Sequence, residues 1–306
     1  MYAYVLAAPH FHLGLAQAEF CAFTGCTTTG RIGLAPVAVD ISRAAFISSC
    51  VHVAAAGTSL DEVCADARAK GLAWEGFHIQ TFCPGEGSLF TSLEPIIRAA
   101  DAIAGRPNLS SPRVRLALIV SGDLWALGPI ISTYRSDWPA HERRPHFFSG
   151  SLPTRFSRAM VNLVASPGNT LIDPCCGVGV ALIEALACGV EAYGCDINPR
   201  MAAQAAENLV SLGLPQRVFV ADARGIGGRY DAAVLDLPYG RNVGVGKGLY
   251  GDLLGTLRTI TRRGAIVAAR DLSGELEEVF GFGVVHHVEV PKTTMVRHLH
   301  VVAAVE

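Results

Sequence analysis

The sequence has no long uninterrupted apolar segment. Half of its 306 residues are hydrophobic and the mean hydropathy is +0.34, but no run of about 18 apolar residues is free of charged or helix-breaking residues. The first residues also lack the basic region that precedes the apolar core of a signal peptide. We therefore expect no membrane-spanning helix and no secretory signal, and we predict a cytoplasmic protein.

Zinc-type cysteine pairs are absent too. The nine cysteines include no C-x-x-C spacing, and Cys175 and Cys176 are adjacent, which is poor geometry for a disulfide. We expect reduced thiols and no bound metal. His298 and His300 share one face of a terminal strand and could suit a metal, but we favour solvated or core-edge histidines there. A net charge of −2 gives no basic excess of the kind that nucleic-acid-binding proteins often carry.

The length is sufficient for two domains. Residues 1–135 mix predicted strands, among them 37–41 and 46–51, with predicted helices in no regular βαβ order, so we predict an α+β accessory domain. Residues 136–153 contain prolines and a cluster of charges that interrupt all periodicity, and we predict a linker there.

From Thr170 onward, strands and helices alternate. A helix opens at Asn198-Pro199, which supplies an N-cap and a proline at the first helical position. Two alternating segments, 284–290 and 298–305, close the chain as a hairpin. We predict that residues 154–306 form a doubly wound α/β domain with an antiparallel edge.

The segment 170–182, TLIDPCCGVGVAL, reads as a buried strand, an acid, a glycine turn and the start of a helix. Gly177 and Gly179 let backbone N–H groups approach a ligand at the helix N-terminus. Leu182 stands where a dinucleotide fingerprint needs its third glycine, and no Lys follows as in a phosphate-binding P-loop. The acid, Asp173, favours a cationic or amino-bearing ligand.

Four acids follow four successive predicted strands: Asp173, Asp196, Asp222 and Asp236. The carboxyl ends of parallel strands form one crevice in an open α/β sheet, so we expect these acids to line one site. Together they could hold an ammonium group, a ribose diol and an adenine amine, and they would attract a sulfonium. S-adenosylmethionine carries all four groups. The loop Asp236-Leu237-Pro238-Tyr239-Gly240 could hold a planar amine while the aromatic ring stacks on it.

These motifs resemble those of a known family. DPCCGVG is similar to the D-P-F-C-G-T-G motif, and DLPYG to the D-P-P-Y/F-G motif, of THUMP-associated class I RNA (guanosine-N2) methyltransferases. RRPHFFSGSLPTRFSRAMVNLV resembles the segment before their glycine loop, and GCDINPRMAAQAAENL their ribose-binding segment. The chain departs from the family at Cys175, Val178 and Leu237, where Phe, Thr and Pro are usual. The resemblance spans about 144–302, and the first 135 residues resemble a reduced ferredoxin-like/THUMP-like domain.

The resemblance implies a Rossmann-like class I methyltransferase domain, S-adenosylmethionine as cofactor, and tRNA or another structured RNA as partner. It implies cofactor contacts at the four acids and at Cys175, Gly177, Gly179, Ile197 and Ala223. Asp236 would hydrogen-bond the attacking N2 amine of a flipped-out guanosine, Pro238 would orient its second N–H, and Tyr239 would stack on the base.

Three alternatives stay open from the sequence. A DNA amino-methyltransferase and a protein-glutamine methyltransferase use related acid-Pro-Pro-aromatic loops, although no DNA target-recognition insert is evident. A non-catalytic partner protein could keep the same fold, but it would have no need of the acids at 173, 196 and 236.

Overall fold

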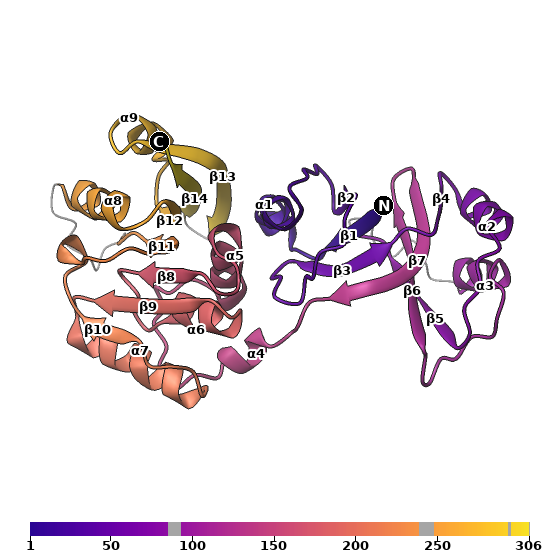
Figure 1. Cartoon of the computed structure of the whole chain (residues 1–306), viewed down its shortest axis with the longest axis horizontal. Helices are drawn as coiled ribbons and strands as arrows, with labels where there is room; N and C mark the ends of the chain where they lie inside the picture. Colours follow the sequence, from indigo (N-terminus) through magenta and orange to yellow (C-terminus); the bar gives the residue numbers. More distant parts are fainter. Residues whose placement is uncertain (85–92, 239–247, 293–294, 306) are drawn as a thin grey trace. The chain divides into compact units, whose positions relative to one another are not determined.

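The computed structural model describes residues 1–84, 93–238, 248–292 and 295–305, and it divides into two compact units, Met1–Arg135 and Ser136–Glu306 (Figure 1). Among the described residues, no helix combines the length and apolar character that a membrane crossing requires. We describe each unit by itself.

A mixed sheet forms the first unit. The strand order is β2-β1-β3-β7-β6-β5, with β4 paired to β7. Strands β5 and β6 run parallel, and the other strand pairs among the described residues of this unit are antiparallel. Helices α2 and α3 cover part of the sheet with buried residues such as Val63 and Ala99, which pack with Leu116 and Leu118. The unit is the predicted α+β domain. Its elements are β1 (Tyr2–Leu6), η1 (His10–His12), α1 (Leu13–Thr24), β2 (Ile32–Ala35), β3 (Ile47–His52), β4 (Ala55–Gly57), α2 (Leu60–Ala69), β5 (Phe77–Phe82), α3 (Glu94–Asp101), β6 (Val114–Ser121) and β7 (Leu124–Thr133).

The predicted strand at 37–41 is wrong. The buried Tyr4 side chain satisfies the backbone there: its hydroxyl donates to the Val37 carbonyl at 2.8 Å and accepts the Val39 N–H at 2.9 Å. A side chain therefore takes the place of a neighbouring strand. The strand that pairs with β1 is β2, which ends before this segment.

The second unit is a doubly wound α/β domain. Strands and helices alternate from β8 to α9, and an antiparallel hairpin closes the sheet, as the sequence predicted. Its elements are α4 (Trp138–His141), α5 (Thr154–Val164), β8 (Thr170–Asp173), α6 (Val180–Ala187), β9 (Glu191–Asp196), α7 (Pro199–Ser211), β10 (Val218–Val220), η2 (Ala223–Gly225), β11 (Ala232–Asp236), α8 (Leu249–Ile260), β12 (Arg263–Ala268), α9 (Ser273–Glu278), β13 (Phe282–Lys292) and β14 (Met295–Ala304).

The sheet of this unit has the order β10-β9-β8-β11-β12-β14-β13. The last strand of the chain, β14, therefore lies between β12 and β13 and is antiparallel to both. On one face, Leu235 and Ile266 pack with Leu254 and Leu257 of α8. Because side chains alternate along a strand, the intervening residues point to the other face, where α5 contacts β11, β12 and α6. The order reverses between β8 and β11, and ligands of open α/β sheets bind at the carboxyl ends of strands at such a point.

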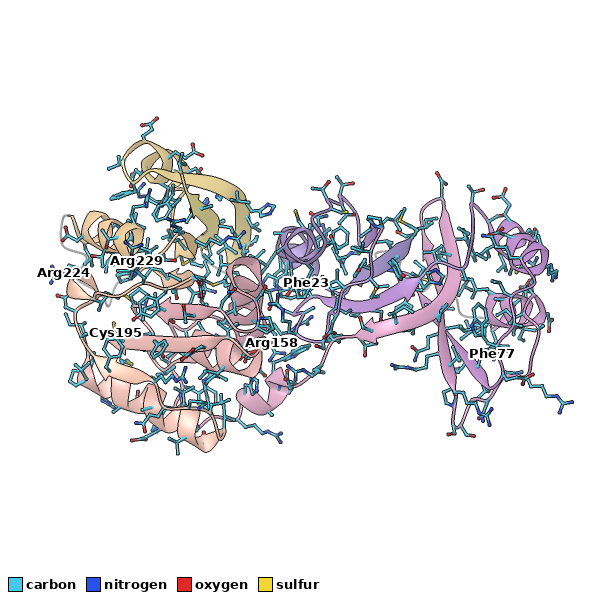
Figure 2. All side chains as sticks on the ribbon, in the orientation of Figure 1. Phe23, Phe77, Arg158, Cys195, Arg224 and Arg229 are labelled. Carbon is cyan, nitrogen blue, oxygen red and sulfur yellow. The ribbon has the colours of Figure 1, made fainter. Side chains whose placement is uncertain are left out.

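The segment 136–153, where we expected a linker, lies within the second unit. Arg158 of α5, labelled in Figure 2, is fully buried; it binds Glu184 of α6 and also Asp137. His141 Nδ1 lies 2.6 Å from the other oxygen of Glu184. This buried ionic cluster joins the segment before α5 to the body of the domain.

Asn208 of α7 makes a second connection. Its side-chain oxygen accepts the His146 N–H at 2.8 Å, and its amide nitrogen donates to the carbonyls of His146 and Val178 at 3.0 and 2.9 Å. One buried side chain thus links residues before α5 to the glycine loop.

Candidate active site

The glycine loop after β8 has the backbone that its two glycines allow. Gly177 and Gly179 adopt φ of 54° and 83°, in the left-handed region that other residues avoid. Gly179 lies directly before α6, and its carbonyl accepts the Ile183 N–H at 3.0 Å. A side chain at Gly179 would also lie 3.1 Å from the Ala205 side chain, so the loop lies tightly against α7.

Asp196, at the end of β9, faces this loop. One carboxylate oxygen accepts the Gly177 N–H at 2.9 Å, and the other accepts the Asn198 N–H at 2.9 Å. The carboxylate therefore fixes both the glycine loop and the entry into α7. It holds the two neighbouring strand ends in a defined arrangement.

A cavity of about 1010 Å³ opens at the carboxyl ends of the parallel strands. All four strand-end acids line it, as we predicted from their spacing: Asp173, Asp196, Asp222 and Asp236. Five other predicted site residues also line it: Cys175, Gly177, Ile197, Ala223 and Pro238. Gly179 does not line the cavity; its left-handed backbone allows the loop to turn into α6. Tyr239 and Gly240 lie outside the described residues.

The carboxyl group of Asp173 is strongly perturbed by its surroundings. Asp173 is only 6% exposed to solvent, and burial raises the pKa of its carboxyl group to about 8. The Cys175 N–H, which donates to Asp173 Oδ1 at 3.2 Å, lowers this pKa, while the negative charges of Asp236 and Asp196 raise it. The carboxyl groups of Asp173, Asp196 and Asp236 thus repel one another when they are ionised. A cation bound in the cavity would relieve this repulsion.

Asp222 is in a different environment. The Arg224 guanidinium donates to both carboxylate oxygens, at 3.0 and 3.1 Å from Nε and 2.6 Å from Nη2, and holds the pKa of Asp222 well below its usual range. This ion pair is well exposed to solvent. Arg224 also lines the cavity, and it is a site residue that the strand-end pattern does not single out.

The loop after β11 is held at both of its first residues. The Leu237 N–H donates to the Val267 carbonyl at 2.9 Å, and Leu237 is buried. The Tyr250 hydroxyl, from α8, donates to the Pro238 carbonyl at 3.0 Å. The role of Tyr250 in holding this loop was not predicted from the sequence, because nothing in the residues around it indicates a contact with a residue twelve positions away.

The wall opposite the strand ends comes from residues that we expected to be a linker. Residues 148–152 line the cavity, and Phe148 is 45% exposed at its edge. Ser157 of α5 also lines it; its hydroxyl is buried and has no hydrogen-bond partner within the described part of the chain. A buried hydroxyl of this kind is available to a ligand.

A family model for the RMKL-like methyltransferase domain matches residues 141–295, slightly more than half of the chain. The matched segment contains the glycine loop, all four acids and the cavity.

Two curated relatives carry the name tRNA (guanine(10)-N2)-dimethyltransferase. The one from Pyrococcus abyssi is 32% identical over 187 residues, which cover 56% of this chain and 56% of that protein. The one from Methanocaldococcus jannaschii is 30% identical over 212 residues, which cover 63% of this chain and 59% of that protein. The chain thus spans less than two thirds of the length of either relative.

Among solved structures, TrmN from Thermus thermophilus aligns over 99% of both chains with a TM-score of 0.50 and 20% identity. This similarity supports the fold of the chain.

Proposed function

Because this chain belongs to the RMKL-like methyltransferase domain family, we propose that it transfers a methyl group from S-adenosylmethionine to the N2 amine of a guanosine in tRNA. The observation that carries the proposal is the convergence of four strand-end acids in one cavity. The names of the two relatives support tRNA guanosine as the acceptor. The N-terminal unit would contribute to RNA binding. Thiols such as those of Cys50, Cys64 and Cys195, which form no disulfide in the described residues, accord with a cytoplasmic location.

The residues of the cavity fit this donor. Asp173, Asp196 and Asp222 offer carboxylates for an ammonium group, a ribose diol and an adenine amine, and the unpartnered Ser157 hydroxyl offers one more polar contact. A side chain at Gly177 would meet no atom within 4 Å, so the loop leaves open space beside its backbone. When bound, S-adenosylmethionine supplies the electrophilic methyl group.

We assign Asp236 to the acceptor side of the reaction. It is half-buried at the end of β11 and lines the same cavity as Asp173. In our proposal its carboxylate accepts a hydrogen bond from the attacking amine, which raises the nucleophilicity of the nitrogen, and it receives the proton after the methyl group has moved. Positioning supplies most of the rate acceleration, because the sulfonium is a good leaving group.

The Pro238 carbonyl has a defined orientation because Tyr250 donates to it. A carbonyl has two lone pairs, so this oxygen can accept a second hydrogen bond from the acceptor amine while it keeps the first. The predicted stacking of Tyr239 on the base remains part of the proposal.

The test is a label-transfer assay with methyl-labelled S-adenosylmethionine. Unmodified tRNA should become labelled, and nucleoside mass spectrometry should locate the label on guanosine N2. Double-stranded DNA and protein should stay unlabelled. Labelling of DNA or of glutamine side chains instead of tRNA would refute the proposed acceptor.

A variant separates chemistry from donor binding. Asp236→Ala should lower the turnover number by about 100-fold or more, because it removes the hydrogen bond that positions the attacking amine, and a small misplacement of a reactant can cost that much. Binding of S-adenosylmethionine, measured by calorimetry, should remain measurable. The control is Asp231→Asn. Asp231 directly precedes β11, at the end of that strand opposite to Asp236, and does not line the cavity; its carboxylate accepts the Thr170 N–H. Equal turnover in Asp236→Ala and the wild type would remove Asp236 from the mechanism.

A further inference from the structure

Four potential metal ligands lie together on the C-terminal hairpin. His287 and Glu289 are two residues apart on β13, so their side chains share one face of the sheet. In the register of the hairpin, His287 pairs with His300 and Glu289 pairs with His298. Three imidazoles and one carboxylate thus occupy one block of cross-strand neighbours, where side chains interact directly.

The atoms of this block are close enough to share an ion. His287 Nε2 lies 3.0 Å from His298 Nδ1, and His298 Nδ1 lies 3.9 Å from the Glu289 carboxylate. The ligand atoms of these three residues all lie within 4.8 Å of one another. Ligands about 2.0–2.2 Å from a tetrahedral metal lie about 3.3–3.6 Å apart, between the 3.0 and 3.9 Å separations of this block.

The charges in the block favour a cation. Protonated imidazoles at these separations would repel one another, since the His287 ring stacks on His298 at 5.3 Å and on His300 at 4.7 Å between centroids. Neutral imidazole nitrogens and a carboxylate instead suit a divalent transition metal such as Zn²⁺. Mg²⁺ and Ca²⁺ prefer oxygen ligands.

A second layer surrounds the block. His300 is fully buried, and its Nε2 lies 3.0 Å from Asp271 Oδ1. Asp271 is fixed in turn by Ser273, whose N–H and hydroxyl donate to the same oxygen at 2.8 and 2.6 Å. This oxygen lies 3.9 Å from His287 Nε2. His300 and Asp271 thus form the packed and charged surroundings of His287, and the carboxylate of Asp271 adds negative charge beside the block.

From this geometry we infer that His287 Nε2, His298 Nδ1 and the Glu289 carboxylate bind one divalent transition-metal ion of the zinc class. His300 stacks on the His287 ring, and Asp271 lies 3.9 Å from His287 Nε2. The inference departs from the sequence-based expectation that the histidines of the terminal strands, His286, His287, His298 and His300, are solvated or lie at the edge of the core. It is separate from the residues proposed for methyl transfer, and it ties β13 to β14 by a bond across the hairpin.

The test uses the full chain without a polyhistidine tag, stripped of metal by a chelator. Calorimetry with Zn²⁺ should give one strong site per chain, and Mg²⁺ should not compete. Co²⁺ should bind the same site and produce the visible d–d bands of a four-coordinate ion, without the intense band of thiolate ligation. That thiolate band would refute the site by placing the metal on cysteines.

Variants identify the ligands. His287→Ala and His298→Ala should abolish the strong site, and Glu289→Gln should weaken it. His300→Gln removes only a stacked neighbour of His287 and should lower the affinity less than loss of either histidine ligand. The matched control is His286→Ala, a neighbour on the same strand outside the cluster, which should keep full affinity. Circular dichroism checks that each variant is folded.

Two results would overturn the inference. One is the absence of a 1:1 site in the folded wild-type protein. The other is retention of the site in His298→Ala and Glu289→Gln together with its loss in Asp271→Asn, which would assign the ion to Asp271, His287 and His300 instead.

Discussion

Binding of S-adenosylmethionine should release a proton from Asp173. In the free protein, burial raises the pKa of this carboxyl group to about 8, so the group is about 90% protonated at pH 7. A sulfonium or ammonium group bound in the same cavity favours the ionised form and lowers this pKa. The donor therefore binds the deprotonated protein better, and its affinity should rise with pH.

The magnitude follows from the fraction of deprotonated Asp173. With a pKa of about 8 in the free protein, and with the donor binding only the ionised form, this fraction rises about ninefold between pH 6 and pH 7. The dissociation constant should fall by the same factor. At pH 7, about 0.9 protons should be released for each molecule bound.

Calorimetry in buffers of different ionisation enthalpy measures both quantities. Asp173→Asn should remove the proton release and flatten the pH dependence. Asp123→Asn, an exposed acid in the N-terminal unit, should keep both. If the wild-type protein releases no protons at pH 7 and its affinity is constant from pH 6 to pH 7, our assignment of the charged group next to Asp173 is wrong.

The raised pKa of Asp173 also makes the free energy of unfolding depend on pH, and this free energy falls as the pH rises, whereas the donor affinity increases. The unfolded chain ionises Asp173 near pH 4, whereas the folded protein without donor keeps the proton until about pH 8. The contribution of this group to the free energy of unfolding is therefore present below pH 4 and is lost as the pH rises from about 4 to about 8. Asp173→Asn should reduce that loss, which denaturant titrations at pH 5 and pH 8 would measure.

Two further predictions concern the frame of the cavity. Arg158→Met leaves the buried Glu184 without its main cation and should lower the free energy of unfolding, measured by urea titration, by about 3–5 kcal/mol. The control Arg155→Met changes a half-buried residue of the same helix and should lower it by about 1 kcal/mol or less. Equal costs would show that the ionic cluster adds no special stability. Gly179→Ala forces a left-handed backbone on alanine and should lower the free energy of unfolding by about 1–2 kcal/mol. The control Gly255→Ala lies in an uncrowded turn of α8 and should raise the free energy of unfolding by about 0.5–1 kcal/mol in the same assay. A neutral Gly179→Ala would contradict the need for glycine in the loop.

The sequence was sufficient to place the acids of the cavity. Each follows a short buried strand, and parallel strands bring their carboxyl ends together, so Asp173 and Asp236 could be assigned to one site although 63 positions separate them. The glycines of the loop could be identified because the backbone angles they adopt are rare for other residues.

Contacts made by single side chains over long distances could not be predicted in this way. The Tyr250 bond to the Pro238 carbonyl and the Arg158 pair with Glu184 leave no periodic signal. The segment 136–153 was interpreted as a linker because its prolines and charges interrupt the periodicity of the sequence. Asp137 and His141 instead pair with side chains of α5 and α6, and the last residues of the segment line the cavity.

The position of β14 between β12 and β13 matters for how the protein is made. During synthesis from the N-terminus, β12 leaves the ribosome with one backbone edge open, and only residues 295–304 can close it. Until they emerge, β13 has no sheet neighbour, and the apolar strand 263–268 can pair with another chain. Truncations before residue 295 should therefore yield insoluble protein, although every acid of the cavity would still be present.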